Sequence, residues 1–222
     1  MATLTVRYDI PAPRFVHGFV YEGEETERAA LKEAMRNDLL MPYRRRVLSA
    51  ASGRVLEIGI GSGVNLPFYR TAVRQIIGIE PSPKLLEMTA QLAKRISMTP
   101  GLIEGTAEAL PLDDRSVDTV VTTWTMCSIP DIEKAVREMH RVLKPNGRLL
   151  FVEHGLAPEP RVRWWQDHFT PLWKRCSGGC HLNRPIADII QSAGFHIEHL
   201  DTAYMGGPKP VTFTYEGTAR PL

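Results

Sequence analysis

Apolar and polar residues alternate in blocks along the chain, and the length and composition of these blocks change at about Arg54. From there on, short runs of branched apolar residues are separated by longer amphipathic stretches. The runs occupy residues 55–59, 75–79, 102–103, 117–121 and 148–152. Uninterrupted apolar runs of this length are typical of strands that are buried on both faces, as in a parallel sheet covered by helices. Two further strands are expected at 195–200 and 211–215.

Two of the amphipathic stretches have clear helix starts. The hydroxyl of Ser82 can accept a hydrogen bond from a free backbone amide, and Pro83 suits the first helical position, so a helix is predicted over 83–94. Asp131 can cap a second helix over 132–143 in the same way. That helix carries an apolar stripe, which consists of Ile132, Val136, Met139 and Leu143. Strands that alternate with helices predict an α/β fold with a doubly wound, mostly parallel sheet.

The chain is expected to form a single domain over residues 1–222, because it is long enough for one sizeable core and shows neither a linker nor a repeat. Residues 1–50 have a helical pattern and are expected to form an N-terminal helical cap. Whether residues 1–20 close over a ligand as a lid is left open. Residues 51–222 would form the core, with an insert at 158–185 that covers part of the binding site.

Composition narrows the class of protein. With 43% apolar and 23% charged residues the chain can collapse around a core by itself, and its net charge of +2 is too small to attract duplex phosphates. No nucleic acid partner is expected. The three cysteines cannot all pair, which favours a reducing compartment, and neither a secretory signal nor an apolar stretch of about 18–20 residues is found. We expect a cytoplasmic protein, monomer or homodimer, with no integral membrane span; peripheral membrane contact is left open.

Glycines at alternate positions follow the first predicted strand. Gly59, Gly61 and Gly63 come directly after the apolar run, where the chain must turn tightly before it continues. Because glycine lacks a Cβ atom, such a turn can adopt positive φ angles and let a ligand approach the backbone closely. In a doubly wound sheet, ligands bind at this place, outside the carboxyl ends of the strands. The turn is therefore the first candidate for a binding site.

Two carboxylates indicate which ligand this turn suits. Glu57 lies in the strand two residues before the first glycine, where it would repel a phosphate and attract an ammonium group. Val64 stands where a dinucleotide-binding fingerprint has its third glycine, so a pyrophosphate is disfavoured. Glu80 ends the next strand and is placed to accept hydrogen bonds from two ribose hydroxyls. The pattern favours S-adenosylmethionine, which carries an ammonium and a sulfonium but no phosphate.

With these residues in view, the chain from about Arg54 onward resembles the class I methyltransferases. The similar stretches are 57–63 (first glycine motif), 78–82 (ribose acid), 105–111 (adenine-flanking loop), 118–123 (fourth strand) and 143–148 (before the fifth strand). The resemblance implies a Rossmann-like sheet of seven strands, the last of them antiparallel, with S-adenosylmethionine as cofactor and S-adenosylhomocysteine as product. The residues that it implies for cofactor binding are Glu57, Gly59, Gly61, Gly63, Glu80, Pro81, Ser82, Thr106, Ala107, Glu108 and Thr123.

The residues after the fourth predicted strand indicate the kind of acceptor. The chain lacks the Asn or Asp, two prolines and an aromatic residue that amino-directed DNA and protein methyltransferases have there. Cys127 follows Met126 and not a proline, so it fits a small buried side chain better than the nucleophile of a cytosine-modifying enzyme. The metal-binding acids of catechol enzymes cannot be placed either, and no metal is predicted. A small-molecule acceptor is therefore expected.

Within the family, the chain is most similar to the alkyl thiol methyltransferases. The similar stretches are 121–128, 152–154, 165–167 with 171–173, and 179–184. The stretches after residue 160 lie outside the motifs that all these methyltransferases share for the cofactor, so they indicate the subfamily. The chain differs from that group in having no N-terminal membrane helix and in having Gly178 where an Asp is expected. The resemblance implies methyl transfer to the sulfur of a thiol.

Transfer from a sulfonium neutralises charge, so alignment and exclusion of water can supply most of the acceleration. A thiol has a pKa near about 8.5, and a modest base then produces enough thiolate at neutral pH. His154, just after the fifth predicted strand, and His181 are the candidate bases, although a structural role fits each of them as well. Cys176, Cys180 and His181 are also conceivable metal ligands, but three donors without a further Cys or His pair argue against zinc.

The insert at 158–185 is rich in aromatic residues. Trp165, Phe169 and Trp173 recur at helical spacing, which favours packing in the core over a substrate wall. Pro171 is expected to break or kink this helix, because a proline has no amide hydrogen to donate.

Three alternatives stay open at this point. The first keeps the cofactor and changes the acceptor, giving C- or N-methylation of a quinone precursor or of a phospholipid amine. The second is a non-catalytic module that binds S-adenosylmethionine and regulates a partner. The third is a nucleotide-dependent oxidoreductase, against which Glu57 and Val64 argue.

Overall fold

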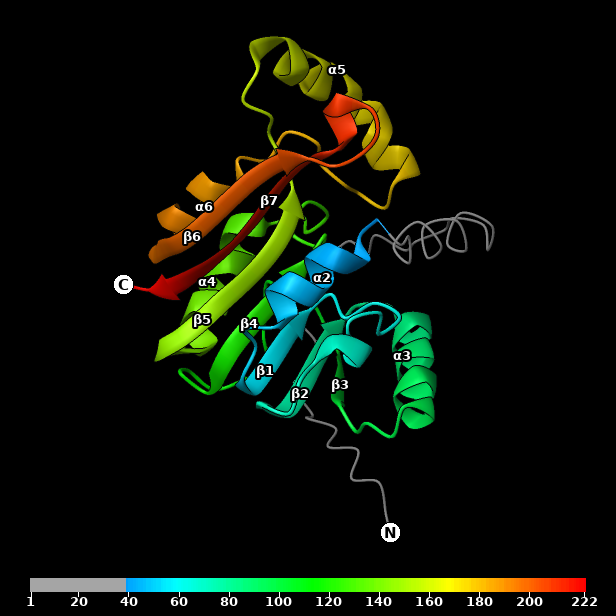
Figure 1. Cartoon of the computed structure of the whole chain (residues 1–222), viewed down its shortest axis with the longest axis vertical. Helices are drawn as coiled ribbons and strands as arrows, with labels where there is room; N and C mark the ends of the chain where they lie inside the picture. Colours follow the sequence, from blue (N-terminus) through cyan, green and yellow to red (C-terminus); the bar gives the residue numbers. More distant parts are fainter. Residues whose placement is uncertain (1–38) are drawn as a thin grey trace, which may run out of the picture.

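A computed structural model describes residues 39–222 of the chain, and its strands form one seven-stranded sheet (Figure 1). The strands are β1 (Gly53–Ile58), β2 (Val73–Glu80), β3 (Gly101–Glu104), β4 (Val117–Thr123), β5 (Leu143–His154), β6 (Phe195–Tyr204) and β7 (Phe213–Pro221). The helices are α2 (Met41–Leu48), α3 (Pro83–Arg95), α4 (Ile132–Val142), α5 (Pro160–Cys176) and α6 (Ile186–Ser192), with 3-10 turns η1 (Leu66–Phe68) and η2 (Lys209–Val211).

The order of the strands across the sheet is β3-β2-β1-β4-β5-β7-β6. The five strands from β3 to β5 run parallel, and β7 is antiparallel to both of its neighbours. This confirms the predicted α/β fold with a mostly parallel, doubly wound sheet. The chain runs outward in one direction from β1 and in the other from β4, so the crevice between the carboxyl ends of these two strands is the topological switch point.

Both faces of the sheet are covered. On one face Val121, Leu150 and Val152 pack against Val47 and Leu48 of α2. On the other face, neighbouring residues of the same strands join one large core with α4 and α6; that core includes Val120, Leu149, Phe151, Val136, Met139 and Ile190. Figure 1 shows α2 in front of the sheet and α4 behind it. Because each strand buries alternate residues on both sides, its sequence reads as a continuous apolar run.

The two predicted helix caps are present. The hydroxyl of Ser82 accepts a hydrogen bond from the Leu85 amide at 3.4 Å, and the Asp131 carboxylate accepts one from the Lys134 amide at 3.0 Å. The helix after Asp131 ends at Val142, one residue before its predicted end, because the chain there enters β5. The most N-terminal part of the predicted cap lies outside the described residues, of which only α2 belongs to it.

The predicted strand at 211–215 begins too early. A 3-10 turn, Lys209–Val211, precedes β7, which starts at Phe213 and runs to Pro221. A proline at position 210 has no amide to donate to a neighbouring strand, which favours a turn over strand pairing there. Pairing with β5 and β6 then extends the strand well beyond the short apolar run that marked it.

Helix α5 lies across the carboxyl end of β5 (Figure 1). It continues through Pro171 without a break, so of the predicted break or kink the break is not found. Asp167 and Pro171 are both exposed, so the carbonyl oxygen that loses its amide partner can be hydrated. Core packing of the aromatic stripe is also wrong for Trp165 and Phe169, which are 53% and 42% exposed. The side chain that attaches the helix is the fully buried Gln166, which accepts from the Ala157 amide at 2.9 Å and donates to the Gly155 carbonyl at 3.0 Å.

Within residues 39–222, none of the helices is both long enough and apolar enough to cross a bilayer.

Candidate functional site

The glycine turn after β1 has the backbone conformation that its sequence predicts. Gly59, Gly61 and Gly63 have φ angles of +64°, +57° and +78°. A Cβ atom added at Gly59 would lie only 2.5 Å from the methyl carbon of Thr125, in the segment after β4. The Gly59 amide donates to the Ile79 carbonyl at 2.9 Å, which ties the turn to β2. The turn therefore sits in the crevice between β1, β2 and β4, with Thr125 against Gly59 and room beside Gly61, where the nearest atom to an added Cβ is 3.8 Å away.

Glu80, the last residue of β2, borders this turn. One carboxylate oxygen accepts a hydrogen bond from the Gly61 amide at 3.2 Å, and the other accepts one from the Ser82 amide at 3.1 Å. Glu80 is 7% exposed, and burial raises the pKa of its carboxyl above the ordinary range, against the effect of the two amides. The carboxylate thus joins the glycine turn to the start of α3, where Pro81 is exposed and Ser82 half-buried.

The loop after β3 approaches the same place. The Gly105 amide donates to the Glu80 carbonyl at 3.3 Å, so the predicted adenine-flanking residues follow directly beside the end of β2. Thr106 is exposed, Ala107 is buried, and a Glu108 carboxylate oxygen accepts from the Asp131 amide at 3.4 Å. The residues predicted to bind the cofactor therefore gather at the carboxyl ends of β1, β2 and β3.

Glu57 lies in a buried polar network. It is 2% exposed, and its two oxygens accept hydrogen bonds from the Asn65 amide group and the Tyr69 hydroxyl, each at 2.8 Å. Burial raises the pKa of the Glu57 carboxyl to about 7, although the two donors and the nearby Arg44 guanidinium lower it. Arg44 in turn donates to the Asn65 side-chain oxygen at 2.8 Å and to the Thr123 hydroxyl at 2.9 Å. Two of the predicted cofactor residues, Glu57 and Thr123, are thus connected within the protein.

Sequence reasoning missed Arg44, Asn65 and Tyr69 as members of this network. Asn65 and Tyr69 follow the glycine motif by only a few residues, so a polar residue buried after that motif was an available signal. Arg44 stands in a basic run with two exposed arginines, and nothing in the sequence distinguishes it from them. Its burial follows from the packing of α2 on the sheet.

The turn after β4 is shaped by Glu153. Trp124 has a φ of +52°, and the next two amides, of Thr125 and Met126, donate to the Glu153 carboxylate at 3.1 and 3.0 Å. The Thr122 hydroxyl donates to the same carboxylate. Glu153 is fully buried, and burial raises its pKa to about 7. Since Glu153 comes from β5, it positions the β4 turn from the neighbouring strand.

Beyond this turn, three sulfur and nitrogen donors meet. We refer to Cys127, His154 and Cys180 as the thiol–imidazole cluster. Their donor atoms all lie within 4.8 Å of one another, and the Cys180 sulfur is 3.5 Å from Nδ1 of His154. Cys127 is 4% exposed and His154 5% exposed. Nε2 of His154 is buried and makes no hydrogen bond with any residue of the described part of the chain. Cys127 is buried, as predicted, and its sulfur is also one of three possible metal-ligand atoms that lie together.

His181, the second predicted base, lies on the other side of Cys127. Its ring Nδ1 is 3.1 Å from the Cys127 carbonyl oxygen, which also accepts from the His181 backbone amide at 2.8 Å. Burial, and then the nearby Arg184 guanidinium, lower the pKa of His181. Arg184 is 7% exposed and donates to the carbonyl oxygens of Met126 and Ile129. Arg184 thereby fastens the segment that carries Cys180 and His181 to the turn after β4.

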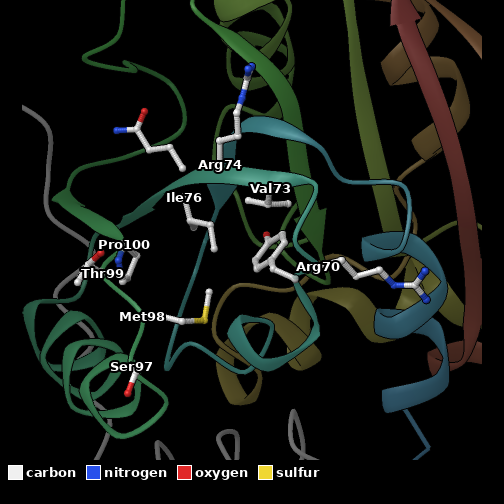
Figure 2. Close-up of a pocket in the computed structure, with 10 residues that line it drawn as sticks. Arg70, Val73, Arg74, Ile76, Ser97, Met98, Thr99 and Pro100 are labelled. Atoms are coloured by element: carbon white, nitrogen blue, oxygen red, sulfur yellow. The ribbon is translucent and has the colours of Figure 1, made fainter.

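A pocket of about 200 Å³ lies elsewhere, between the start of β2 and the segment 97–100 (Figure 2). Figure 2 shows Val73, Ile76 and Met98 on its walls, with Arg70 and Arg74 at its rim. This pocket is near the amino end of β2. Because ligands of doubly wound sheets bind at the carboxyl ends, it is separate from the candidate site.

The chain is similar to proteins of known family. A model of the family described as "Methyltransferase domain" matches residues 56–151. The human thiol S-methyltransferase TMT1B is 34% identical over 156 residues, which cover 67% of this chain and 63% of that protein. The phosphatidylethanolamine N-methyltransferase of Cereibacter sphaeroides is 33% identical over 117 residues, 51% of this chain and 57% of that protein. The chain therefore spans about three fifths of the length of these curated relatives.

The fold also has close structural neighbours. The crystal structure of the YcgJ protein from Bacillus subtilis superposes with a TM-score of 0.62 at 19% sequence identity, covering 82% of this chain and 95% of that one. A methyltransferase from Aquifex aeolicus, described as dependent on S-adenosylmethionine, superposes with a TM-score of 0.62 at 16% identity, covering 87% and 98%. At such identities the likeness concerns the fold.

Proposed function

Because the chain belongs to the class I methyltransferases that depend on S-adenosylmethionine, we propose that it transfers the methyl group of this donor to the sulfur of a small thiol. The observation that carries the choice of a thiol is the thiol–imidazole cluster. Its three members come from the three separate stretches 121–128, 152–154 and 179–184, which resemble the alkyl thiol methyltransferases. The similarity to TMT1B, a thiol S-methyltransferase, supports the same acceptor.

The donor would lie across the carboxyl ends of β1 to β3. The Glu80 carboxylate would exchange its hydrogen bond from the Gly61 amide for those of the two ribose hydroxyls. Gly59, Gly61 and Gly63 would let the methionine part of the donor approach the backbone, and the ammonium group would face the buried network around Glu57 and Thr123. Pro81, Ser82, Thr106, Ala107 and Glu108 would flank the ribose and the adenine.

The sulfonium would then point toward the turn after β4. Thr125 touches Gly59, and the cluster begins only two residues later, at Cys127. In the reaction the acceptor loses its S–H proton, the thiolate attacks the methyl carbon, and the bond from that carbon to the sulfonium breaks. The products are a methyl thioether and S-adenosylhomocysteine. Because a positive and a negative charge are neutralised together, a poorly hydrated site accelerates the step.

His154 and His181 are the candidate bases for the acceptor proton. Nε2 of His154 has no hydrogen-bond partner among residues 39–222, and burial lowers the pKa of His181, which favours the neutral ring that can accept a proton. Loss of either base would lower kcat, and acceptors that are already ionised at the assay pH would be affected least.

A second candidate is N-methylation of a phospholipid amine, which is favoured by the similarity to the Cereibacter sphaeroides enzyme. One assay separates the candidates. The full chain, with S-adenosylmethionine, is offered alkyl thiols, hydroxyaryl precursors of quinones and aminolipids, and S-adenosylhomocysteine and the methylated products are quantified. We expect kcat/KM to be at least about tenfold higher for thiols. Faster turnover of the aminolipid would contradict S-methylation, and donor binding without turnover on any acceptor would indicate a non-catalytic module.

A further inference from the structure

We propose that Cys127, His154 and Cys180 bind a zinc ion, and that the thiol acceptor is its fourth ligand. The second half of this statement rests on the proposed function; the metal site itself does not. Two thiolates and one imidazole form a donor set that suits zinc, and three protein ligands with one open position are typical of catalytic zinc sites.

The distances fit this ion. In a tetrahedral zinc site, with a thiolate at about 2.3 Å and an imidazole nitrogen at about 2.0–2.1 Å, the two ligand atoms are about 3.6 Å apart. The Cys180 sulfur and Nδ1 of His154 are separated by 3.5 Å, and all donor atoms of the cluster lie within 4.8 Å of one another. The donors would therefore need only small side-chain adjustments to coordinate one ion.

The three donors are held by independent elements. His154 is the last residue of β5 and pairs with Thr214 of β7 in the sheet. Cys127 follows the turn that Glu153 shapes, and its carbonyl oxygen accepts the His181 amide at 2.8 Å. Arg184 fastens the segment of Cys180 to this turn. A site that is assembled from such constrained elements loses little conformational entropy when it binds a metal.

A positive charge lies close to the two sulfurs. The buried Arg184 guanidinium interacts electrostatically with both Cys127 and Cys180. Two thiolates balance the charge of a zinc ion, so a third thiolate, from the acceptor, gives the site one negative charge. Arg184 on one side and the sulfonium of the donor on the other would face that charge, which is lost again when the methyl group is transferred.

The zinc ion would replace a strong base. An acceptor thiol binds to the open position and releases its proton to water, because coordination by zinc deprotonates a thiol. The bound thiolate attacks the methyl carbon, the bond from this carbon to the sulfonium breaks, and the thioether leaves because its sulfur is a weaker ligand. In this arrangement His154 is a ligand of the metal and does not act as a base, since the proton of the acceptor leaves to water.

Metal content tests the site without any turnover. The full chain is purified under reducing conditions, incubated with zinc chloride and separated from free ion by gel filtration. We expect about one equivalent of zinc to remain bound. Cys127→Ser, Cys180→Ser and His154→Asn should each weaken zinc affinity by at least about tenfold. The matched control His199→Asn, at an exposed histidine of β6 that pairs with Asp201 at 3.0 Å, should retain zinc like the wild type.

Cobalt substitution provides a second measurement, on the wild-type protein only. Adding an alkyl thiol should change the thiolate-to-cobalt charge-transfer band if the acceptor joins the ion. A folded wild type that keeps less than about a tenth of an equivalent of zinc would overturn the site, and an unchanged cobalt band would overturn the acceptor as ligand. Bound zinc without thiol turnover would refute the proposed function and support the site. Undiminished thiol methylation by zinc-free protein would support the proposed function and overturn the acceptor as a ligand of zinc.

A separate observation concerns the outer surface of α5. Four of its large apolar side chains, Trp164, Trp165, Phe169 and Leu172, are 42–55% exposed, and we call them the α5 face. Arg161 and Arg163 at one end of the helix and Lys174 and Arg175 at the other are exposed too. A helix usually buries its apolar side chains and exposes its polar ones. In α5 the fully buried Gln166 and the largely buried Thr170 face the protein instead.

We infer that the α5 face binds the surface of a membrane that contains anionic lipids. Tryptophan side chains favour the boundary between lipid headgroups and acyl chains, and a helix lies in that boundary when cationic residues accompany its apolar face. The four cations at the helix ends have one acidic neighbour in α5, Asp167, so the charge of this surface is complementary to anionic headgroups. Because α5 lies beside the carboxyl end of β5, the candidate site would open close to the membrane (Figure 1).

Vesicle sedimentation tests this inference. The full chain should sediment with phosphatidylcholine vesicles that contain phosphatidylserine, more weakly at high salt, and with a blue shift of tryptophan emission. Trp165→Gln combined with Phe169→Gln should reduce binding at least about tenfold. The control Leu200→Gln, at an exposed leucine of β6, should bind as the wild type does. Equal binding by the double variant would refute the inference. If a soluble quencher could not reach the α5 tryptophans in the lipid-free protein, that result would refute it too, because the α5 face would not be exposed.

Discussion

Replacing Gly59 with alanine tests the close contact between the glycine turn and the segment after β4. At a φ of +64° an alanine pays for a left-handed backbone, a cost of about 1–2 kcal/mol. Its Cβ would also lie 2.5 Å from the methyl carbon and 2.7 Å from the hydroxyl oxygen of Thr125. Overpacking of this kind costs about 1–3 kcal/mol, so the free energy of unfolding should fall by about 2–5 kcal/mol in total.

Gly61 provides the matched control. Its φ of +57° imposes the same backbone strain, but the nearest atom to an added Cβ, the Gly59 carbonyl oxygen, is 3.8 Å away. Gly61→Ala should therefore lose only the strain, about 1–2 kcal/mol. The difference between the two variants in urea unfolding measures the clash with Thr125.

A third variant closes the cycle. Thr125→Ala removes the two nearest atoms and leaves the Thr125 Cβ at 3.2 Å, so the double variant Gly59→Ala/Thr125→Ala should recover about 1–3 kcal/mol relative to the sum of the single changes. If Gly59→Ala is no less stable than Gly61→Ala, or if the double variant shows no recovery, the turn and the β4 segment do not touch and the placement of the sulfonium beside the cluster is wrong.

Three further predictions follow from the site. Glu80→Ala should weaken S-adenosylmethionine binding in calorimetry by about tenfold to hundredfold, since a charged hydrogen-bond acceptor contributes about 1.5–3 kcal/mol; unchanged affinity would contradict the assignment to the ribose. The folded-state pKa of Glu57 and Glu153 is about 7, above 4.5, so the stability that protonation provides is complete below pH 4.5 and lost as pH rises to about 7. The free energy of unfolding in urea, measured at several pH values, should show this fall, and Glu153→Gln should make the fall smaller, because only Glu57 then contributes. His154→Gln should lower kcat while donor affinity stays within about twofold; a parallel loss of donor binding would show that the histidine acts on the cofactor pocket.

The strands and helix starts were predictable because their causes are local. Continuous apolar runs mark strands buried on both faces, and Ser82 and Asp131 cap their helices with their own side chains. The direction that α5 faces was not predictable. Helical spacing shows that Trp165 and Phe169 share a side, but the side that is buried depends on Gln166 reaching Gly155, a contact that no periodicity encodes.

The residues that carry the chemistry after β4 were predictable from the sequence, but their arrangement in space was not. His154 and the three stretches that resemble thiol methyltransferases were identified from the sequence. Their meeting depends on the register of β4 with β5, which pairs Thr123 with Val152, and on the attachment of Cys180 through Arg184. These long-range contacts place Cys127 beside His154 and Cys180, which lie far from it along the chain, whereas its sequence context indicated only a small buried side chain.

The destination of the methyl carbon tests the account most directly. The full chain is incubated with S-adenosylmethionine carrying a carbon-13 methyl group and with an equal mixture of an alkyl thiol and an aminolipid, and the labelled products are identified by mass spectrometry and NMR. The account predicts a labelled methyl thioether that forms in step with S-adenosylhomocysteine. Label that appears on nitrogen, or on no acceptor at all while the donor is bound, would contradict it.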